Sequence, residues 1–118
     1  MNKYQTFGLD RSERLCEAKD FLRLKRSGKR TFGKTLTYVT CPNDFKHPRV
    51  GCIVSRKTGN AVVRNKWKRV MREFFRAHKP LFSTSTDHLW IVKASTVGKP
   101  PVTIFQEMKT LLGKERPA

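Results

Sequence analysis

The stretch VGCIVSRKTGNAVVRNKWKRVMREFFRAH, residues Val50–His78, decides how the rest of the chain can fold. Apolar residues occupy every second position of Val50–Ser55, and this period of two predicts a strand. Gly59 and Asn60 then offer a permissive backbone and a side-chain hydrogen-bond acceptor, which are typical of a turn into a helix. From Ala61 to about His78 the apolar residues recur at helical spacing. The stretch therefore predicts a strand, a turn and a long helix.

The helix expected after this turn has an apolar stripe and a basic ladder. The stripe holds Val63, Trp67, Val70, Met71, Phe74 and Ala77. The ladder repeats at every fourth residue, with two further polar residues beside it: Arg64, Lys68, Arg72 and Arg76, then Asn65 and Arg69. At about 100° per residue, we expect the ladder to lie opposite the stripe. One face of the helix would then fold the protein and the other would bind a partner.

The ladder favours an anionic ligand. Like charges four residues apart destabilise a helix by about 0.2–0.5 kcal/mol per pair, and a bound polyanion would relieve that cost. Most charged helix faces are only solvated, but here Arg56 and Lys57 also precede a helix N-terminus, whose free N–H groups favour phosphate. The expected phosphate-binding residues are Arg56, Lys57, Asn60, Arg64, Asn65, Lys68, Arg69, Arg72 and Arg76.

The same residues resemble the signature of a known family. The pattern R-V-G-x-x-V-S-R-K-x-G-N-A-V-x-R-N-x-x-K-R-x-x-R-E, from Arg49 to Glu73, is similar to that of the protein subunit of bacterial ribonuclease P. Arg64-Asn65-Lys66 resembles the family's "RNR" helix with one Arg replaced by Lys. The resemblance extends over about Arg14–Leu112. It implies an α+β sandwich of two layers, with three helices, a mixed, mainly antiparallel sheet of about four strands, and a left-handed β-α-β crossover.

The resemblance also implies a function. Members of this family assist a catalytic RNA, which removes the 5′ leader of precursor tRNA with magnesium ions. The resemblance therefore implies that the protein binds this RNA and the leader. It implies no cofactor bound by the protein alone and no obligate protein partner. Single-strand grooves combine aromatic side chains with positive charge. The candidates for a leader cleft are Phe21, Tyr38 and Lys57. The sequence does not decide which face of the sheet Tyr38 occupies. Lys25 stands where many relatives have a second aromatic residue.

The composition limits the number of domains and the kinds of partner that the chain can have. The chain has 118 residues, the length of one domain, and 26 Lys and Arg against 9 Asp and Glu give a formal charge of +17. Nucleic acid or another anionic surface is therefore expected as a partner. No apolar run approaches the roughly 20 residues of a membrane span, and no signal peptide is apparent at the start, so we expect a soluble, cytoplasmic protein. Residues 1–11 and 114–118 are expected to be a loose arm and a frayed tail.

The segment before the central stretch predicts a helix and a strand. Apolar residues at helical spacing predict the helix over Arg14–Ser27, with Gly28 after it. Thr, Phe, Tyr and Val residues predict a strand over Thr31–Cys41. Its second half, Leu36–Cys41, is expected to pair antiparallel with Arg49–Ser55.

The segment after the central stretch predicts a buried strand and a last helix. The nearly continuous apolar run His88–Ala94, which follows a polar loop, predicts a strand that is covered on both sides. Thr103 and Gln106 form a T-x-x-Q capping box, which predicts the start of a third helix that ends at Gly113.

Residues that could carry protein-based catalysis are scattered. The three cysteines form no C-x-x-C pair and are expected to be reduced, with Cys52 a small core residue. His47, His78 and His88 have no metal-ligand spacing, and the acidic residues near the first helix are expected to pair with Arg or the helix dipole. Two alternatives remain beside the ribonuclease P interpretation: a general RNA- or DNA-binding structural protein of the ribosomal type, and a stand-alone nuclease.

Overall fold

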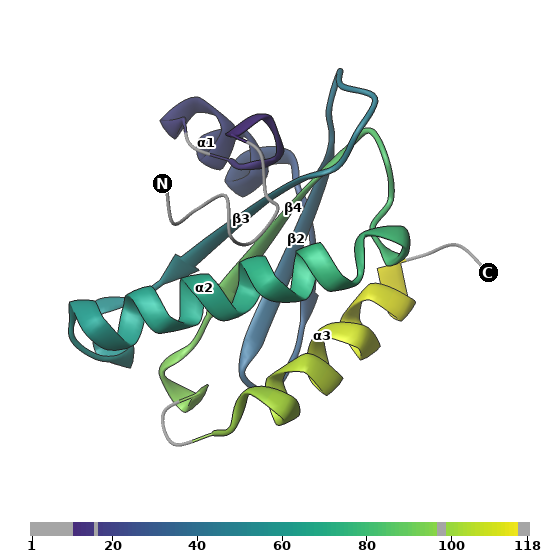
Figure 1. The fold of residues 1–118 in the computed structure, drawn as a ribbon. Coiled ribbons are helices and arrows are strands. Elements are labelled where there is room, and N and C mark those ends of the chain that lie inside the picture. Colours follow the sequence, from purple (N-terminus) through teal and green to yellow (C-terminus); the bar gives the residue numbers. More distant parts are fainter. Residues whose placement is uncertain (1–10, 16, 97–98, 116–118) are drawn as a thin grey trace, which may run out of the picture.

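The structure, a computed structural model, describes residues 11–15, 17–96 and 99–115, which form an α+β fold with a mixed sheet, as predicted (Figure 1). Along these residues the helices and strands are α1 (Ala18–Ser27), β1 (Lys29–Phe32), β2 (Leu36–Pro42), β3 (Arg49–Val54), α2 (Ala61–Ala77), β4 (Thr86–Val92) and α3 (Pro101–Glu115). No helix in the described ranges is both long enough and apolar enough to span a membrane. The predicted arm lies almost wholly outside these ranges.

The strand order in the sheet is β1-β2-β4-β3. β2 pairs antiparallel with β1 and β4, and β3 pairs parallel with β4. The predicted pairing of Leu36–Cys41 with Arg49–Ser55 is therefore wrong, because β4 lies between them. The apolar residues of β4 point to both sheet faces, and a strand of this kind gains most by lying at the centre of the sheet, where both faces are covered.

The single strand predicted over Thr31–Cys41 is two strands. The chain turns between β1 and β2, and the Glu107 carboxylate of α3 accepts hydrogen bonds from the backbone N–H groups of Thr35 (3.0 Å) and Leu36 (2.8 Å). The hydroxyl of Thr35 donates to the same carboxylate at 2.8 Å. A side chain more than 70 residues away in the sequence therefore stabilises the hairpin.

The helices cover opposite faces of the sheet. α1 packs on one face through Leu24, against Val39 and Leu89, and α2 and α3 cover the other. In Figure 1, α2 lies in front of the sheet, and β4 lies to the left of β3 when both strands are turned to point upward. The β3-α2-β4 crossover is therefore left-handed, as the family resemblance implied, against the right-handed rule that holds for about 98% of such units.

The main core lies between the sheet and the pair α2 and α3. The apolar stripe of α2 is confirmed at Trp67, Val70, Met71 and Phe74, which are buried, whereas Ala77 is exposed. Phe75 is fully buried although it lies outside the predicted stripe, because its ring packs edge-on against Phe82 after the helix, with centroids 4.9 Å apart. The turn that follows α2 therefore widens its buried face.

The start of α2 follows its sequence signals. The side chain of Asn60 accepts a hydrogen bond from the N–H of Val63 at 3.1 Å, so it caps the helix as predicted. A Cβ at Gly59 would lie 2.8 Å from the Cβ of Val63, which explains why the turn before the cap contains a glycine. The helix ends beside His78, also as predicted.

The starts of the other two helices differ from the prediction. α1 begins at Ala18 instead of Arg14, because Leu15 runs along the edge of β3 and its N–H donates to the carbonyl of Val50 at 2.9 Å. α3 begins at Pro101, whose missing N–H suits the first helical position, so Thr103 lies within the first turn instead of at the N-cap. α3 also continues past Gly113, so the predicted end of this helix was too early.

The burial of Trp67 allows a direct test of the main core. Trp67 retains only 4% of its surface exposed, so Trp67→Ala is expected to lower the free energy of unfolding by about 3–5 kcal/mol. Chemical denaturation followed by circular dichroism would measure the loss. Lys66→Ala, at the exposed neighbouring position, is the matched control and should change it by less than about 0.5 kcal/mol. An unchanged midpoint for Trp67→Ala would contradict this core.

Candidate RNA interface

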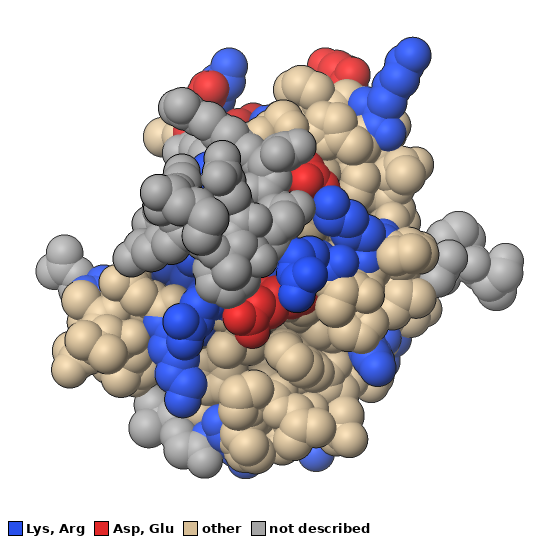
Figure 2. All heavy atoms as spheres, in the orientation of Figure 1, with Lys and Arg blue, Asp and Glu red and all other residues tan. Residues whose placement is uncertain are grey.

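The basic ladder of α2 lies beside the apolar stripe at its beginning and turns away from it along the helix. Arg64, Lys68 and Arg72 are half-buried, whereas Arg76 is exposed. A four-residue step on a helix advances by about 400°, so each rung is rotated by about 40° from the last. The expectation that the whole ladder lies opposite the stripe is therefore corrected. Figure 2 shows the resulting band of Lys and Arg side chains over α2, broken by an acidic group.

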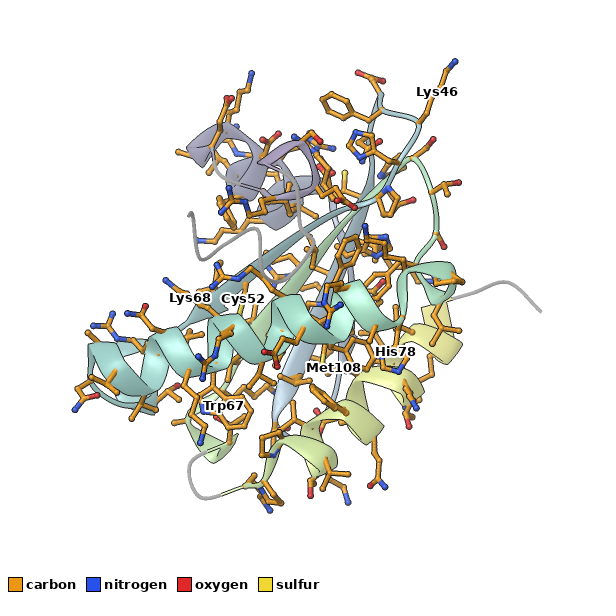
Figure 3. All side chains as sticks on the ribbon, in the orientation of Figure 1. Lys46, Cys52, Trp67, Lys68, His78 and Met108 are labelled. Carbon is orange, nitrogen blue, oxygen red and sulfur yellow. The ribbon has the colours of Figure 1, made fainter. Side chains whose placement is uncertain are left out.

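A pocket of about 290 Å³ lies where α1, the edge strand β3 and α2 meet. Its walls are both apolar and cationic. The lining residues are Arg14, Leu15, Phe21, Val50, Gly51, Cys52, Lys68, Met71 and Arg72. Figure 3 shows Lys68 and Cys52 on the side of α2 that faces β3, while Trp67 lies on the opposite side, toward α3. The same helix thus contributes to the core with one side and to the pocket with another.

Gly51 allows α1 to approach β3. A Cβ at this position would lie 2.9 Å from the Cβ of Leu15 and 3.3 Å from Cε1 of Phe21, so an alanine would push one of these side chains outward. Sequence reasoning did not identify Gly51 or Arg14 as site residues. The glycine between two strand residues was the signal for a close approach, but its partner lies more than 30 residues away.

Cys52 lines the pocket as a neutral thiol. Burial raises its pKa to about 12, although the positive charges of Lys68 and Arg72 act in the opposite direction. A thiol with this pKa is neutral at pH 7, and the thiol is a poorer nucleophile than the thiolate. The prediction that Cys52 is a small packing residue instead of a nucleophile agrees with this chemistry.

The carboxylate of Asp87, which is fully buried at the start of β4, is the centre of an ion network. It accepts hydrogen bonds from Arg49 Nε (2.8 Å), Arg49 Nη2 (2.7 Å), Asn43 Nδ2 (2.8 Å) and the guanidinium of Arg23. Burial alone would raise the pKa of Asp87, but the hydrogen bonds from Arg49 and Asn43 and the charges of the two arginines hold it below its usual value. The hydrogen bond to Asp87 likewise raises the pKa of Arg49.

The network fixes α1, and with it Phe21. Arg49 also binds Asp20 of α1, with Nη2 3.2 Å from Oδ1, and Arg23 of α1 binds Asp87 directly. Phe21 lies between these two α1 residues in the sequence and lines the pocket. The motif residue Arg49 is therefore a structural cation. The predicted pairing of acidic residues near the first helix with arginine is confirmed for Asp20. Asp87 was expected in the polar loop before the strand, but it lies within β4.

The structure separates the three leader-cleft candidates. Phe21 lines the pocket, and Lys57 is exposed in the turn before α2, outside the pocket lining. Tyr38 was wrongly placed in the cleft: it is 1% exposed, on the sheet face that α2 and α3 cover. Its ring stacks on Trp90 with centroids 4.2 Å apart, and its hydroxyl pairs with Nδ1 of His88. A buried tyrosine in this position cannot stack on a base.

The remaining predicted phosphate contacts lie on α2 or just before it. Asn65, Arg69 and Arg76 are exposed along α2. The side chain of Arg56 lies outside the described part of the structure. Asn60 uses its side-chain oxygen to cap α2, so this oxygen is already engaged.

The fold and this cationic site define a class of small basic α+β proteins with a left-handed crossover. The family described as Ribonuclease P matches residues 9–116. The ribonuclease P protein component of Syntrophus aciditrophicus is 41% identical over 107 residues, which cover 91% of this chain and 90% of that protein.

Solved structures agree with the sequence comparison. The structure of a Staphylococcus aureus RNase P protein mutant with defective mRNA degradation activity has a TM-score of 0.85 at 30% identity, with 97% of each chain covered. The RNase P protein from Thermotoga maritima has a TM-score of 0.80 at 28% identity, covering 89% of this chain and 99% of that one. The chain belongs to the ribonuclease P protein family. It acts in tRNA processing as the protein subunit of this endoribonuclease.

The ion network predicts a pH-dependent stability. The lowered pKa of Asp87 means that its stabilising contribution is present above the unfolded-state pKa of about 3.9 and is lost as the pH falls through the folded-state value. Asp87→Asn should therefore lower the free energy of unfolding at pH 7, and its difference from the wild type should shrink below about pH 4. Urea denaturation at pH 7 and pH 3 would measure both.

The matched control is Asp44→Asn, which changes an exposed carboxylate in the loop before β3. It should have little effect at either pH. A deficit of Asp87→Asn that is the same at pH 7 and pH 3 would show that the charge of Asp87 is not what stabilises the fold.

Proposed function

We propose that this chain binds two RNA segments with two sides of α2. The outer side binds the catalytic RNA subunit of ribonuclease P, and the pocket between α1, β3 and α2 binds the single-stranded 5′ leader of precursor tRNA. The observation that carries this proposal is the composition of the pocket, where Phe21 lies with Arg14, Lys68 and Arg72 around one concave site. Single-strand sites in general combine an aromatic platform with cations that follow the backbone.

The size of the pocket suits a single base. Its volume of about 290 Å³ is just below the roughly 300–1,000 Å³ typical of small-molecule sites. A base against Phe21 would leave its phosphates near the cations of α2, Lys68 and Arg72. The rest of the leader would continue outside the pocket, with Lys57 as a candidate contact near the start of α2.

The outer side of α2 suits a structured RNA. Asn65, Arg69 and Arg76 are exposed along the helix and are free of the pocket lining. Asn65, Arg69 and Arg76 therefore form the proposed contact with the RNA subunit.

The RNA subunit is the proposed location of the catalytic centre, with magnesium ions bound there, in the cytoplasm of a bacterial cell. This assignment rests on the family resemblance. Among the described residues no group of three or more His, Cys, Asp and Glu side chains is arranged to hold a metal ion. The role of the protein residues in this proposal is to bind and orient the two RNAs.

The experiment that tests this function is reconstitution. The purified chain is added to the catalytic RNA of a bacterial ribonuclease P and a precursor tRNA with a 5′ leader, at a magnesium concentration too low for the RNA alone. We expect cleavage at the mature 5′ end only when protein and RNA are both present. Binding without restored cleavage would favour a general RNA-binding protein, and cleavage by the protein without RNA would favour a stand-alone nuclease.

A single substitution tests the leader pocket. Phe21→Ala should weaken binding of a leader-bearing precursor to the reconstituted enzyme by about 1–3 kcal/mol, the usual value of one base stack on an aromatic ring. Binding of mature tRNA, which lacks the leader, should not change. Leu22→Ala, at a position on the same helix that is 49% exposed, is the matched control. Equal losses with precursor and mature tRNA would remove Phe21 from leader recognition.

A further inference from the structure

A second cationic surface lies at β1, the sheet edge opposite β3. The segment from Lys25 to Lys34 has five Lys and Arg among ten residues and no acidic residue, against 26 of 118 in the whole chain. All five are exposed: Lys25, Arg26, Lys29, Arg30 and Lys34. The local density of positive charge is therefore more than twice the average of an already basic protein.

Protection of a sheet edge does not explain this segment. Edge strands often carry lysine, which discourages pairing with another chain. An edge that only needs protection would not also present a large aromatic side chain, yet Phe32 at the end of β1 is 68% exposed. An exposed ring with Arg30 two residues before it and Lys34 two residues after it instead resembles the composition of single-strand binding surfaces.

The register of β1 places the ring beside an arginine. Arg30 and Phe32 are two residues apart in the strand, so their side chains point to the same sheet face. Arg30 is paired with Val39, which packs in the cluster around Leu24 of α1. This face is therefore the one that carries α1, and Arg26 is exposed in the last turn of that helix. Phe32 and Arg30 thus share one corner of the sheet, and Arg26 adds a cation at the end of the helix that covers the same face.

This corner lies on the other side of the sheet from α2. Arg30 and Phe32 face the side that carries α1, whereas α2 and α3 cover the opposite face. The sheet therefore separates the two surfaces. No single phosphate can contact both surfaces, and their contributions to RNA affinity should add.

We propose that Arg26, Arg30 and Phe32, with Lys34 in the turn that follows β1, form a second RNA-contact surface. An unpaired RNA segment binds there by stacking one base on Phe32 and by placing its phosphates beside the cations. The proposal rests on the proposed function in one respect only, that the chain acts on RNA. The substrate and the RNA subunit both offer this chemistry, and the experiment distinguishes them.

The experiment compares two triple variants of the full chain. The test variant is Arg26→Gln, Arg30→Gln and Phe32→Ala. The matched control on α3 is Lys109→Gln, Lys114→Gln and Val102→Ala, which removes two exposed lysines and an apolar side chain that is 61% exposed. Circular dichroism verifies that both variants fold. Affinity for the RNA subunit and for leader-bearing precursor tRNA is then measured at several salt concentrations.

The test variant is expected to reduce the salt dependence with one of the two RNAs. Removing two single-strand phosphate contacts should lower the slope of log affinity against log salt by about 1.4, whereas the control should keep the wild-type slope. The RNA that shows the change identifies the source of the bound segment. A photoreactive phenylalanine analogue at position 32 should cross-link to that same RNA. Cross-linking to neither RNA, or a slope equal to that of the control, would overturn the proposal.

A third variant separates this inference from the proposed function. It neutralises Arg64, Lys68, Arg69 and Arg72 of α2 together. If it weakens binding and the β1 variant behaves as the control does, the second surface is wrong and the proposed function stands. If only the β1 variant weakens binding, the assignment to α2 fails and the second surface stands. If both surfaces bind RNA, a variant that carries the β1 and the α2 substitutions together should show a reduction in salt slope equal to the sum of the two separate reductions.

Discussion

The buried carboxylate of Asp87 is the constraint on which the geometry of the site depends. A buried charge is costly unless it is fully hydrogen-bonded, and Asp87 is stabilised by donors from Arg23, Arg49 and Asn43. These donors belong to α1, to the start of β3 and to the loop between β2 and β3. One carboxylate therefore joins the parts of the chain that surround the leader pocket, and it does so without touching the pocket itself.

Local signals predicted the centre of the fold, and non-local contacts decided the rest. The strand, turn and helix from β3 to α2 follow from periodicity and from the cap at Asn60, all within a few residues. The pairing order of the sheet could not be read in this way. The β1–β2 hairpin depends on Glu107 of α3, and the displaced start of α1 depends on a hydrogen bond from Leu15 to β3. The left-handed crossover came only from the family resemblance.

In the candidate site, too, the features set by local sequence were predicted and those set by non-local contacts were not. The cations of α2 could be named from their spacing, because a helix face is a local property. The pocket could not, because it requires the missing side chain of Gly51, the edge position of β3 and the anchoring of Phe21 by Arg49 through Asp20. Alternation in a strand shows that two sets of side chains face apart, but not which set meets a helix. Tyr38 was misplaced for this reason.

Because the basic ladder rotates around α2, the helix fixes the angle between the directions in which its cationic side chains point. From Arg64 to Arg76 the cations turn through about 120°, so the rungs beside the pocket and those facing outward hold a fixed direction relative to each other. Flexible side chains can adjust a distance, but they cannot change this angle. One inserted residue would rotate every later rung by about 100°. Exchanging one cation for another within α2 keeps this angle, whereas changing the length of the helix between two cations does not.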